Sequence, residues 1–236
     1  MLGHGSGKLF YAGNYPPELT CPLSGDKVGT YGPGDTYDSV FTSIGSSYEE
    51  CRAECVGLHL CLEPGVCDIF GHSGADIEDI KYANWLSMVL AGVKGLEMFS
   101  PASMEWKQAH SQARFVIMQV MLEAGQDFLN IKEVTGEDGK PDLLICMDRS
   151  KIMSVGQPAI SKFLLKLQVY KSTGDIKKAK EMYDKYSEVG EPWASRRQTV
   201  VDRRQPRSIL VQGNTVIRDE KLELLQYDSN TEGLVR

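Results

Sequence analysis

The amino-acid sequence predicts a mostly α-helical chain that ends in a short β-rich segment. Two observations support this fold class. Apolar residues recur at near-helical spacing between residues 76 and 99, and turn residues divide the part after residue 200 into short β-like segments. This change in character places a domain boundary near residues 195–200. We therefore expect a helical unit over residues 1–199 and a β-containing segment over residues 200–236.

The first part of the chain is predicted to be irregular. Residues 15–37 contain Pro16, Pro17, Pro22, Pro33 and several glycines, which favour turns over regular structure. A loop of this length inside a compact domain is usually functional or disordered.

Three helices are predicted next. Ser47 is a candidate N-cap, and the helix it begins should run to the Glu63-Pro64 stop. A second helix is predicted over residues 76–99. Ser100-Pro101 matches an N-cap followed by proline at the first helical position, so a third helix should run from there to Glu123. The apolar side of the first helix is expected to consist of Val56, Leu58, Leu60 and Leu62.

Clusters of turn residues divide the rest of the chain into the remaining predicted elements. Residues 136–141 form a turn cluster, and 143–147 read as a short strand. Two more helices are predicted over residues 158–172, ending at Gly174, and 175–189. Three β segments then follow at 208–211, 215–218 and 222–227.

Composition excludes several classes of protein. The formal net charge of −6 argues against a nucleic-acid binder, because such proteins concentrate positive charge. No apolar run approaches the roughly 18 residues of a membrane helix, and no secretory signal is visible at the N-terminus. We expect a cytoplasmic protein with no membrane partner. Its helical cysteines should be reduced and buried; they are Cys51, Cys55, Cys61 and Cys67.

Two pairs of polar residues lie four apart on a predicted helix. Glu50 and Glu54 share one face, and so do His110 and Arg114. A solvated face is one interpretation of the glutamates. The other is a cation above that face, bound by one carboxylate while the other orients a histidine ligand. By contrast, the glycine-rich residues 3–8 lack the spacing of a phosphate-binding loop.

Five stretches of the sequence resemble the dipeptidyl peptidase III family of zinc peptidases. The resemblance covers nearly the whole chain, its second stretch is highly specific, and it favours the cation interpretation. The stretches are Leu2-Gly3-His4-Gly5-Ser6-Gly7-Lys8-Leu9-Phe10, Glu49-Glu50-Cys51-Arg52-Ala53-Glu54, Gln108-Ala109-His110-Ser111-Gln112-Ala113-Arg114-Phe115, Asp148-Arg149-Ser150-Lys151-Ile152 and Lys171-Ser172-Thr173-Gly174-Asp175.

The resemblance implies a fold and a site. Residues 1–199 would form part of the family's helical catalytic lobe, and residues 200–236 the start of a second, β-containing lobe. His4 and Glu50 would be ligands of one Zn²⁺, Glu54 would orient a histidine ligand, and Glu49 would be accessory. His110 would stabilise the transition state. Arg114 and, less closely matched, Arg203 would contact substrate.

The sequence also departs from the family pattern. The family's zinc motif is His-Glu, two residues, then Gly-His, and the first histidine and the catalytic glutamate are absent here. Two of the three protein ligands of a thermolysin-type zinc site therefore remain. We expect a fragment of an enzyme that releases dipeptides from the N-terminus of short peptides, inactive as this chain alone. The alternative is a catalytically dead remnant that serves as a binding or structural module. We expect no adaptor partner, since no Glu-Thr-Gly-Glu loop is present.

Overall fold

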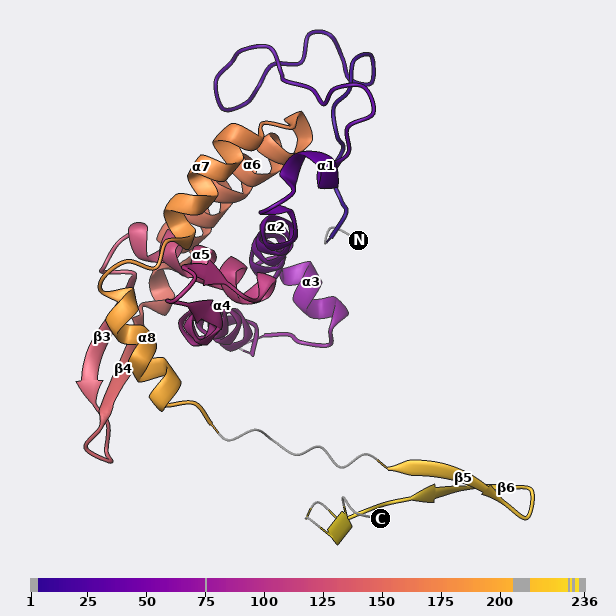
Figure 1. Ribbon diagram of the computed structural model, residues 1–236, viewed down its shortest axis with the longest axis vertical. Helices are drawn as coiled ribbons and strands as arrows, with labels where there is room; N and C mark the ends of the chain where they lie inside the picture. Colours follow the sequence, from indigo (N-terminus) through magenta and orange to yellow (C-terminus); the bar gives the residue numbers. More distant parts are fainter. Residues whose placement is uncertain (1–3, 75, 206–212, 229, 231, 234–236) are drawn as a thin grey trace. The chain divides into compact units, whose positions relative to one another are not determined.

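The computed structural model describes residues 4–74, 76–205, 213–228, 230 and 232–233. It divides into two compact units, Met1–Asp202 and Arg203–Arg236. The first unit is mostly helical, as predicted (Figure 1). Among the described residues, no helix is both long and apolar enough to cross a membrane.

The described part of the first unit contains eight α-helices. Residues before α1 are largely irregular, as predicted, with one isolated bridge between Thr20 and Lys27. The helices are α1 (Tyr37–Phe41), α2 (Gly45–Leu60), α3 (Pro64–Ile69), α4 (Asp76–Gly95), α5 (Ala109–Glu123), α6 (Gln157–Thr173), α7 (Ile176–Ser187) and α8 (Trp193–Asp202). Short helical turns precede β1 (η1, Leu96–Met98) and α6 (η2, Arg149–Lys151; η3, Ile152–Gly156).

Helix α5 lies at the centre of the core. Ala113 and four consecutive residues from Phe115 to Met118 are fully buried on it. Helix α4 packs closely against α5 because Gly92 and Gly95 have no side chain there: a Cβ on Gly92 would lie 2.7 Å from the Arg114 carbonyl oxygen. This close packing fixes the position of α5 against α4, and therefore the position of the first turn of α5.

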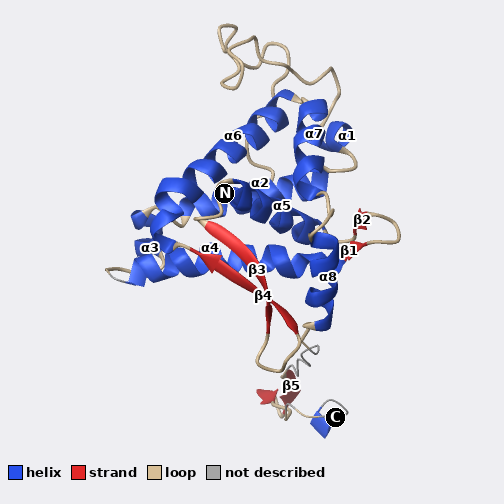
Figure 2. Cartoon of the chain, turned by 90° about the vertical axis from the view of Figure 1, so that its left-hand side faces the viewer, coloured by secondary structure: helices blue, strands red, loops and turns tan. Residues whose placement is uncertain are grey.

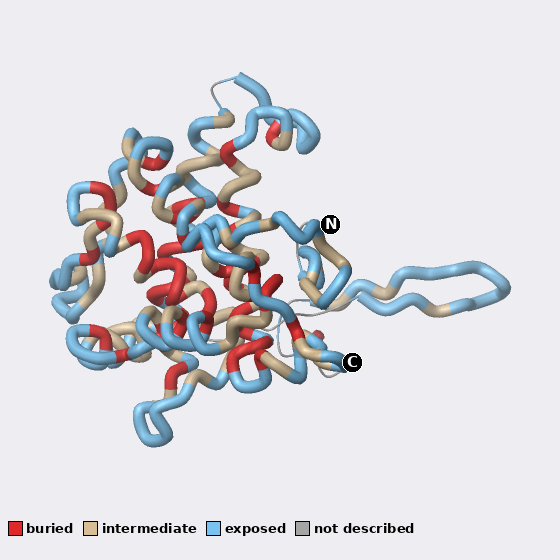
Figure 3. Tube along the Cα trace, turned by 90° about the horizontal axis from the view of Figure 1, so that it is seen from above, coloured by how far each residue is buried: buried red, intermediate tan, exposed pale blue. Residues whose placement is uncertain are grey.

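The strands form three small antiparallel sheets. In the first unit, β1 (Phe99–Ser100) pairs with β2 (Glu105–Trp106), and β3 (Leu129–Thr135) pairs with β4 (Pro141–Met147) through the predicted 136–141 turn. Figure 2 shows the β3–β4 hairpin beside α4 and α8. In the second unit, β5 (Asn214–Arg218) and β6 (Lys221–Leu225) form a hairpin, mostly exposed in Figure 3. Asp219 and Glu220 both have positive φ, as a tight hairpin turn requires.

Two helix starts differ from the prediction. Helix α5 begins at Ala109 with Gln108 as its cap, not at Ser100-Pro101, because Ser100 is paired with Glu105 in the β1–β2 sheet. Helix α2 begins at Gly45, so Ser47 lies inside the helix instead of capping it. The Ser47 side chain is buried against the Tyr183 hydroxyl.

The buried stripe of α2 also differs from the expected apolar side. Residues spaced by two cannot share a helix face, and Val56 and Leu60 are only partly buried. The stripe instead follows the spacing of three and four residues, and consists of Tyr48, Cys51, Cys55 and Leu58. Cys51, Cys55 and Cys67 are buried free thiols, as predicted, whereas Cys61 is half-buried.

Several elements of the first unit were not predicted: α1, α3, β1, β2, β3 and α8. Helix α8 is held by its arginines: Arg197 Nε donates to the Phe99 carbonyl at 2.8 Å, and Arg196 Nε to Glu133 at 3.0 Å. The helix runs to Asp202, across the expected boundary at 199/200.

The predicted helices over 158–172 and 175–189 correspond to α6 and α7, and the β segments at 215–218 and 222–227 to β5 and β6. The β segment predicted at 208–211 lies outside the described residues.

Candidate metal centre

His4 and Glu50 lie side by side although 46 residues separate them. His4 Nε2 is 3.0 Å from Glu50 Oε2, and the Glu50 side chain is 18% exposed. Glu50 lies in the second turn of α2, while His4 belongs to the irregular N-terminal segment that folds back over the helix. The structure thus brings together the two residues that the resemblance gives as metal ligands.

His110 approaches the same carboxylate from the start of α5. Its Nδ1 lies 3.1 Å from Glu50 Oε2, but the direction of approach does not make a hydrogen bond. This nitrogen is buried and has no hydrogen-bond partner among the described residues, although the ring as a whole is 44% exposed. A buried, unpaired ring nitrogen next to a carboxylate is typical of a site that a further group completes.

Glu54 pairs with Arg114, not with a histidine. Glu54 Oε1 accepts a hydrogen bond from Arg114 Nε at 2.8 Å and lies 2.7 Å from one terminal guanidinium nitrogen. Both side chains are partly exposed. The contact joins α2 to α5 one helical turn beyond the Glu50–His110 pair, so it fixes the spacing of the two helices at the site.

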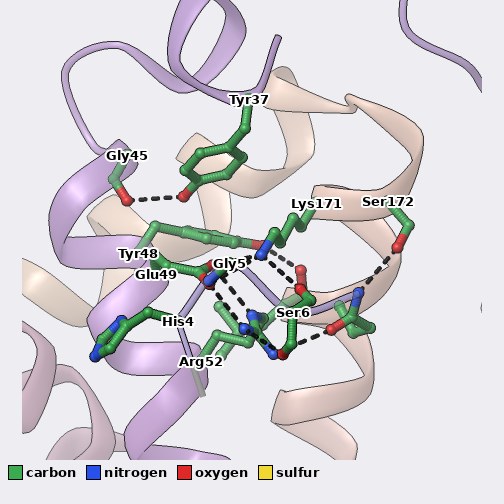
Figure 4. Close-up of polar contacts among 12 residues, drawn as sticks. His4, Gly5, Ser6, Tyr37, Gly45, Tyr48, Glu49, Arg52, Lys171 and Ser172 are labelled. Carbon is green, nitrogen blue, oxygen red and sulfur yellow. Dashed lines mark hydrogen bonds and ion pairs between the residues drawn. The ribbon is translucent and has the colours of Figure 1, made fainter. Parts of the chain in front are cut away.

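Glu49 occupies a buried cluster with two cations. Arg52, 2% exposed, lies 2.7 Å from Glu49 Oε1, and Lys171, 4% exposed, lies 2.8 Å from Oε2. The Gly5 backbone N–H also donates to Glu49 Oε1 at 2.7 Å (Figure 4). Burial acts to raise the pKa of Glu49, but the hydrogen bonds from Arg52 and Lys171 outweigh it and hold the pKa below its ordinary value.

Lys171 is fixed by aromatic residues as well. Its ammonium lies 5.3 Å from the centre of the Tyr37 ring, and the Tyr31 hydroxyl donates to the Lys171 carbonyl at 2.6 Å. Burial lowers the pKa of Lys171, which Glu49 opposes only in part. A cavity of about 580 Å³ borders this cluster, and His4, Tyr37, Asp38, Glu49, Glu50 and Lys171 are among its lining residues.

Arg203 is the first residue of the second unit, directly after α8, and is partly buried. Arg52 and Lys171 are the polar residues that sequence reasoning did not single out. Both residues lie in stretches that resemble the family, and Arg52 also follows Tyr48 by four residues on the buried side of α2. No local pattern pairs Lys171 with Glu49, because only the packing of α6 on α2 brings the two together.

The donor atoms present fit part of a zinc site. With bonds of about 2.0–2.1 Å, two ligand atoms of a tetrahedral zinc lie roughly 3.3 Å apart, close to the 3.0 Å between His4 and Glu50. Within the residues that the structure describes, no group of three or more His, Cys, Asp or Glu side chains is arranged to hold a metal ion. Among the described residues, the candidate zinc donors at this site are therefore one nitrogen, His4 Nε2, and one oxygen, Glu50 Oε2.

The comparisons with known proteins place the chain in a class of peptidases. A family model described as peptidase family M49 matches residues 1–236. The chain belongs to peptidase family M49, which confirms the resemblance found in the sequence.

Relatives named dipeptidyl peptidase 3 match over the full chain. That of Homo sapiens is 48% identical over 247 residues, that of Nematostella vectensis 47% over 242, and that of Dictyostelium discoideum 38% over 251. The chain spans about a third of the length of these relatives (34%, 33% and 35%). Among solved structures, a DPP III from Caldithrix abyssi aligns with 70% of this chain and 26% of its own, at 18% identity and a TM-score of 0.46.

Proposed function

We propose that this chain carries part of the metal and catalytic site of a zinc dipeptidyl peptidase that releases dipeptides from the N-terminus of short peptides in the cytoplasm. The observation that supports this most directly is the approach of His4 Nε2 to Glu50 Oε2 at 3.0 Å, from segments far apart in the sequence. Family membership supports the same reaction class.

In this proposal His4 and Glu50 hold the zinc ion. When bound, zinc polarises the scissile carbonyl and acidifies a water molecule. Glu50 Oε2 lies close to nitrogens of two histidines, His4 and His110, and accepts no hydrogen bond from His110 Nδ1. The partial burial of Glu50 strengthens its attraction for a cation, because water screens it less.

His110 acts on the substrate in this account. Its ring is partly exposed beside Glu50, so its outer edge can donate a hydrogen bond to oxygen charge that develops on the scissile carbonyl. Arg114 lies one turn further along α5 and is held by Glu54. We propose that it forms the wall of the substrate cleft, with Arg203 a further contact for substrate.

Activity requires groups that this chain lacks. The sequence contains neither the first histidine nor the catalytic glutamate of the family motif, and loss of a general base alone reduces rates by about 10²–10⁴-fold. We therefore expect the chain as given to release no dipeptide. The second candidate is a module that binds without catalysing.

The test compares two proteins. One is the chain as given, and the other is an extended chain, in which the residues that precede the matched region in the Homo sapiens relative are joined to its N-terminus. Release of dipeptide from a chromogenic peptide substrate, abolished by a chelator, is expected only for the extended chain. An extended chain that takes up zinc but releases no dipeptide would support the binding module instead. Chelator-sensitive release by the chain as given would contradict the account.

A further inference from the structure

The Lys171 side chain contacts the backbone two residues after His4. It belongs to the last turn of α6, and its Nζ donates to the Ser6 carbonyl at 2.8 Å and to both Glu49 oxygens at 2.8 and 2.9 Å. Figure 4 shows the ammonium between Glu49 and Ser6. The three donor positions of an ammonium are thus directed at acceptors of α2 and of the N-terminal segment.

Arg52 also binds the N-terminal segment, at Ser6. Its guanidinium donates to the Ser6 hydroxyl at 2.9 Å, to Glu49 and, at 3.3 Å, to the Gln168 side chain. Together with the Gly5 N–H on Glu49, these bonds fix residues 5 and 6 at three separate atoms. His4 is the next residue, and it is more than half exposed. The buried cluster therefore fixes the backbone that carries an otherwise exposed histidine.

Stability alone is a poor explanation for this arrangement. Two buried cations face one carboxylate, and replacing buried charges by apolar side chains is often neutral or stabilising. An apolar cluster between α2 and α6 would pack the helices, but it would offer no donor to the Ser6 carbonyl. What the charged cluster adds is the orientation of the segment next to His4.

We propose that Lys171 and Arg52 are positioning residues, which hold residues 4–6 so that His4 Nε2 lies at Glu50. The inference rests on the proposed function, in which these two residues hold the metal. Each acts through its contacts with Ser6 and Glu49. Their loss should weaken metal binding by about 10–100-fold, as is usual when the support of a ligand is removed.

The test uses the chain as given, four single variants and one double variant, Lys171→Met with His4→Ala. Lys171→Met removes the ammonium and keeps most of the side-chain volume. Lys162→Met is the matched control, because Lys162 is an exposed lysine of the same helix. Ser6→Ala removes only the hydroxyl that accepts from Arg52, so it tests the Arg52 contact with the same residue and leaves both cations in place. The fourth variant, His4→Ala, removes the ligand itself.

Two readouts separate positioning from packing. The first is the ¹⁵N backbone dynamics of residues 4–6 and the imidazole resonances of His4, recorded without metal. Lys171→Met, and to a smaller extent Ser6→Ala, should increase the mobility of residues 4–6 and shift the His4 resonances, whereas Lys162→Met should do neither. Unchanged dynamics and resonances in both Lys171→Met and Ser6→Ala would overturn the proposal.

The second readout is zinc affinity per folded molecule, measured well below the unfolding temperature. Lys171→Met should lower it in the presence of His4 and have no further effect in the His4→Ala background, because the two changes act through one ligand. Equal effects in both backgrounds would overturn the positioning role. If the chain binds zinc without any dependence on His4, the proposed function fails, while the metal-free NMR comparison still decides whether Lys171 orders residues 4–6.

Discussion

Glu54 and Arg114 form an ion pair between α2 and α5, with Glu54 Oε1 2.7 Å from the guanidinium. By resemblance, Glu54 would orient a histidine ligand and Arg114 would contact substrate. The ion pair joins these two residues directly. Because both groups are partly exposed, we expect a coupling free energy of about 0.2–1 kcal/mol in a double-mutant cycle of Glu54→Gln and Arg114→Met. Chemical denaturation of the four proteins measures it, and a coupling of zero would mean that the pair is absent in solution.

The packing of α4 on α5 gives a stability prediction. Gly92→Ala places a methyl group 2.7 Å from the Arg114 carbonyl oxygen and 2.8 Å from Met118 Cβ, so it should destabilise the fold by about 1–3 kcal/mol. Gly57→Ala is the matched control. Gly57 is an exposed residue inside α2 whose added Cβ meets nothing within 4 Å, and the change should stabilise by about 0.4–1 kcal/mol. Thermal unfolding of both variants should show shifts of opposite sign.

Alkaline pH should destabilise the helical unit, and Tyr183 is one of the buried tyrosines that contribute. Burial raises the pKa of this phenol well above its ordinary value of 10.0, and its hydroxyl donates to the Ser47 carbonyl at 2.9 Å. The neutral phenol is therefore favoured in the folded state. Its contribution to stability is complete below about pH 10 and is lost as the pH rises above that value.

The Tyr183→Phe variant tests this pH dependence. It loses a hydrogen bond and should be less stable at neutral pH by about 1 kcal/mol. Its free energy of unfolding should fall less steeply above pH 10 than that of the parent, measured by urea titration at several pH values. Tyr15→Phe, at a partly exposed tyrosine, should retain the parental slope. Parallel curves for Tyr183→Phe and the parent would contradict the assignment to Tyr183.

The His110→Ala variant distinguishes a role of His110 in stabilising the transition state from a role in packing. In the extended chain, His110→Ala should lower kcat by about 10²–10³-fold, the usual loss for one oxyanion donor. The ring is 44% exposed, so zinc content and melting temperature should change little. A lower melting temperature with kcat preserved would make His110 a structural residue. Steady-state kinetics and thermal unfolding on one preparation distinguish the outcomes.

Local signals predicted most helices but not the start of α5. Ser100-Pro101 is a strong helix-start signal, yet Phe99 and Trp106 pack edge-to-face with ring centres 5.5 Å apart, and Trp106 Nε1 donates to the Ser187 carbonyl. These tertiary contacts hold residues 99–106 in a small sheet and delay the helix to Ala109. The end of α6 shows the opposite case, since Gly174 with its φ of +69° stops the helix where the sequence predicts.

Sequence motifs pointed to part of the candidate site. Glu50, Glu54, His110 and Arg114 follow from helical spacing and family resemblance, because each pair lies on one helix face. Lys171 lies in a stretch that resembles the family, but its contact with Glu49 could not be found in this way. Its role depends on the distance between α2 and α6, which no local pattern encodes. The same holds for the pairing of Glu54 with Arg114, which joins two helices.

The most direct test of the account is the zinc content of the extended chain and of three variants, measured after dialysis against limiting metal. Glu50→Gln should lose most of the zinc, and Glu54→Gln should bind it about 10–100-fold more weakly. Glu18→Gln, at an exposed glutamate outside the site, should retain full occupancy. Full zinc occupancy in the Glu50→Gln protein would contradict the assignment of Glu50 as a metal ligand, and with it the proposed site.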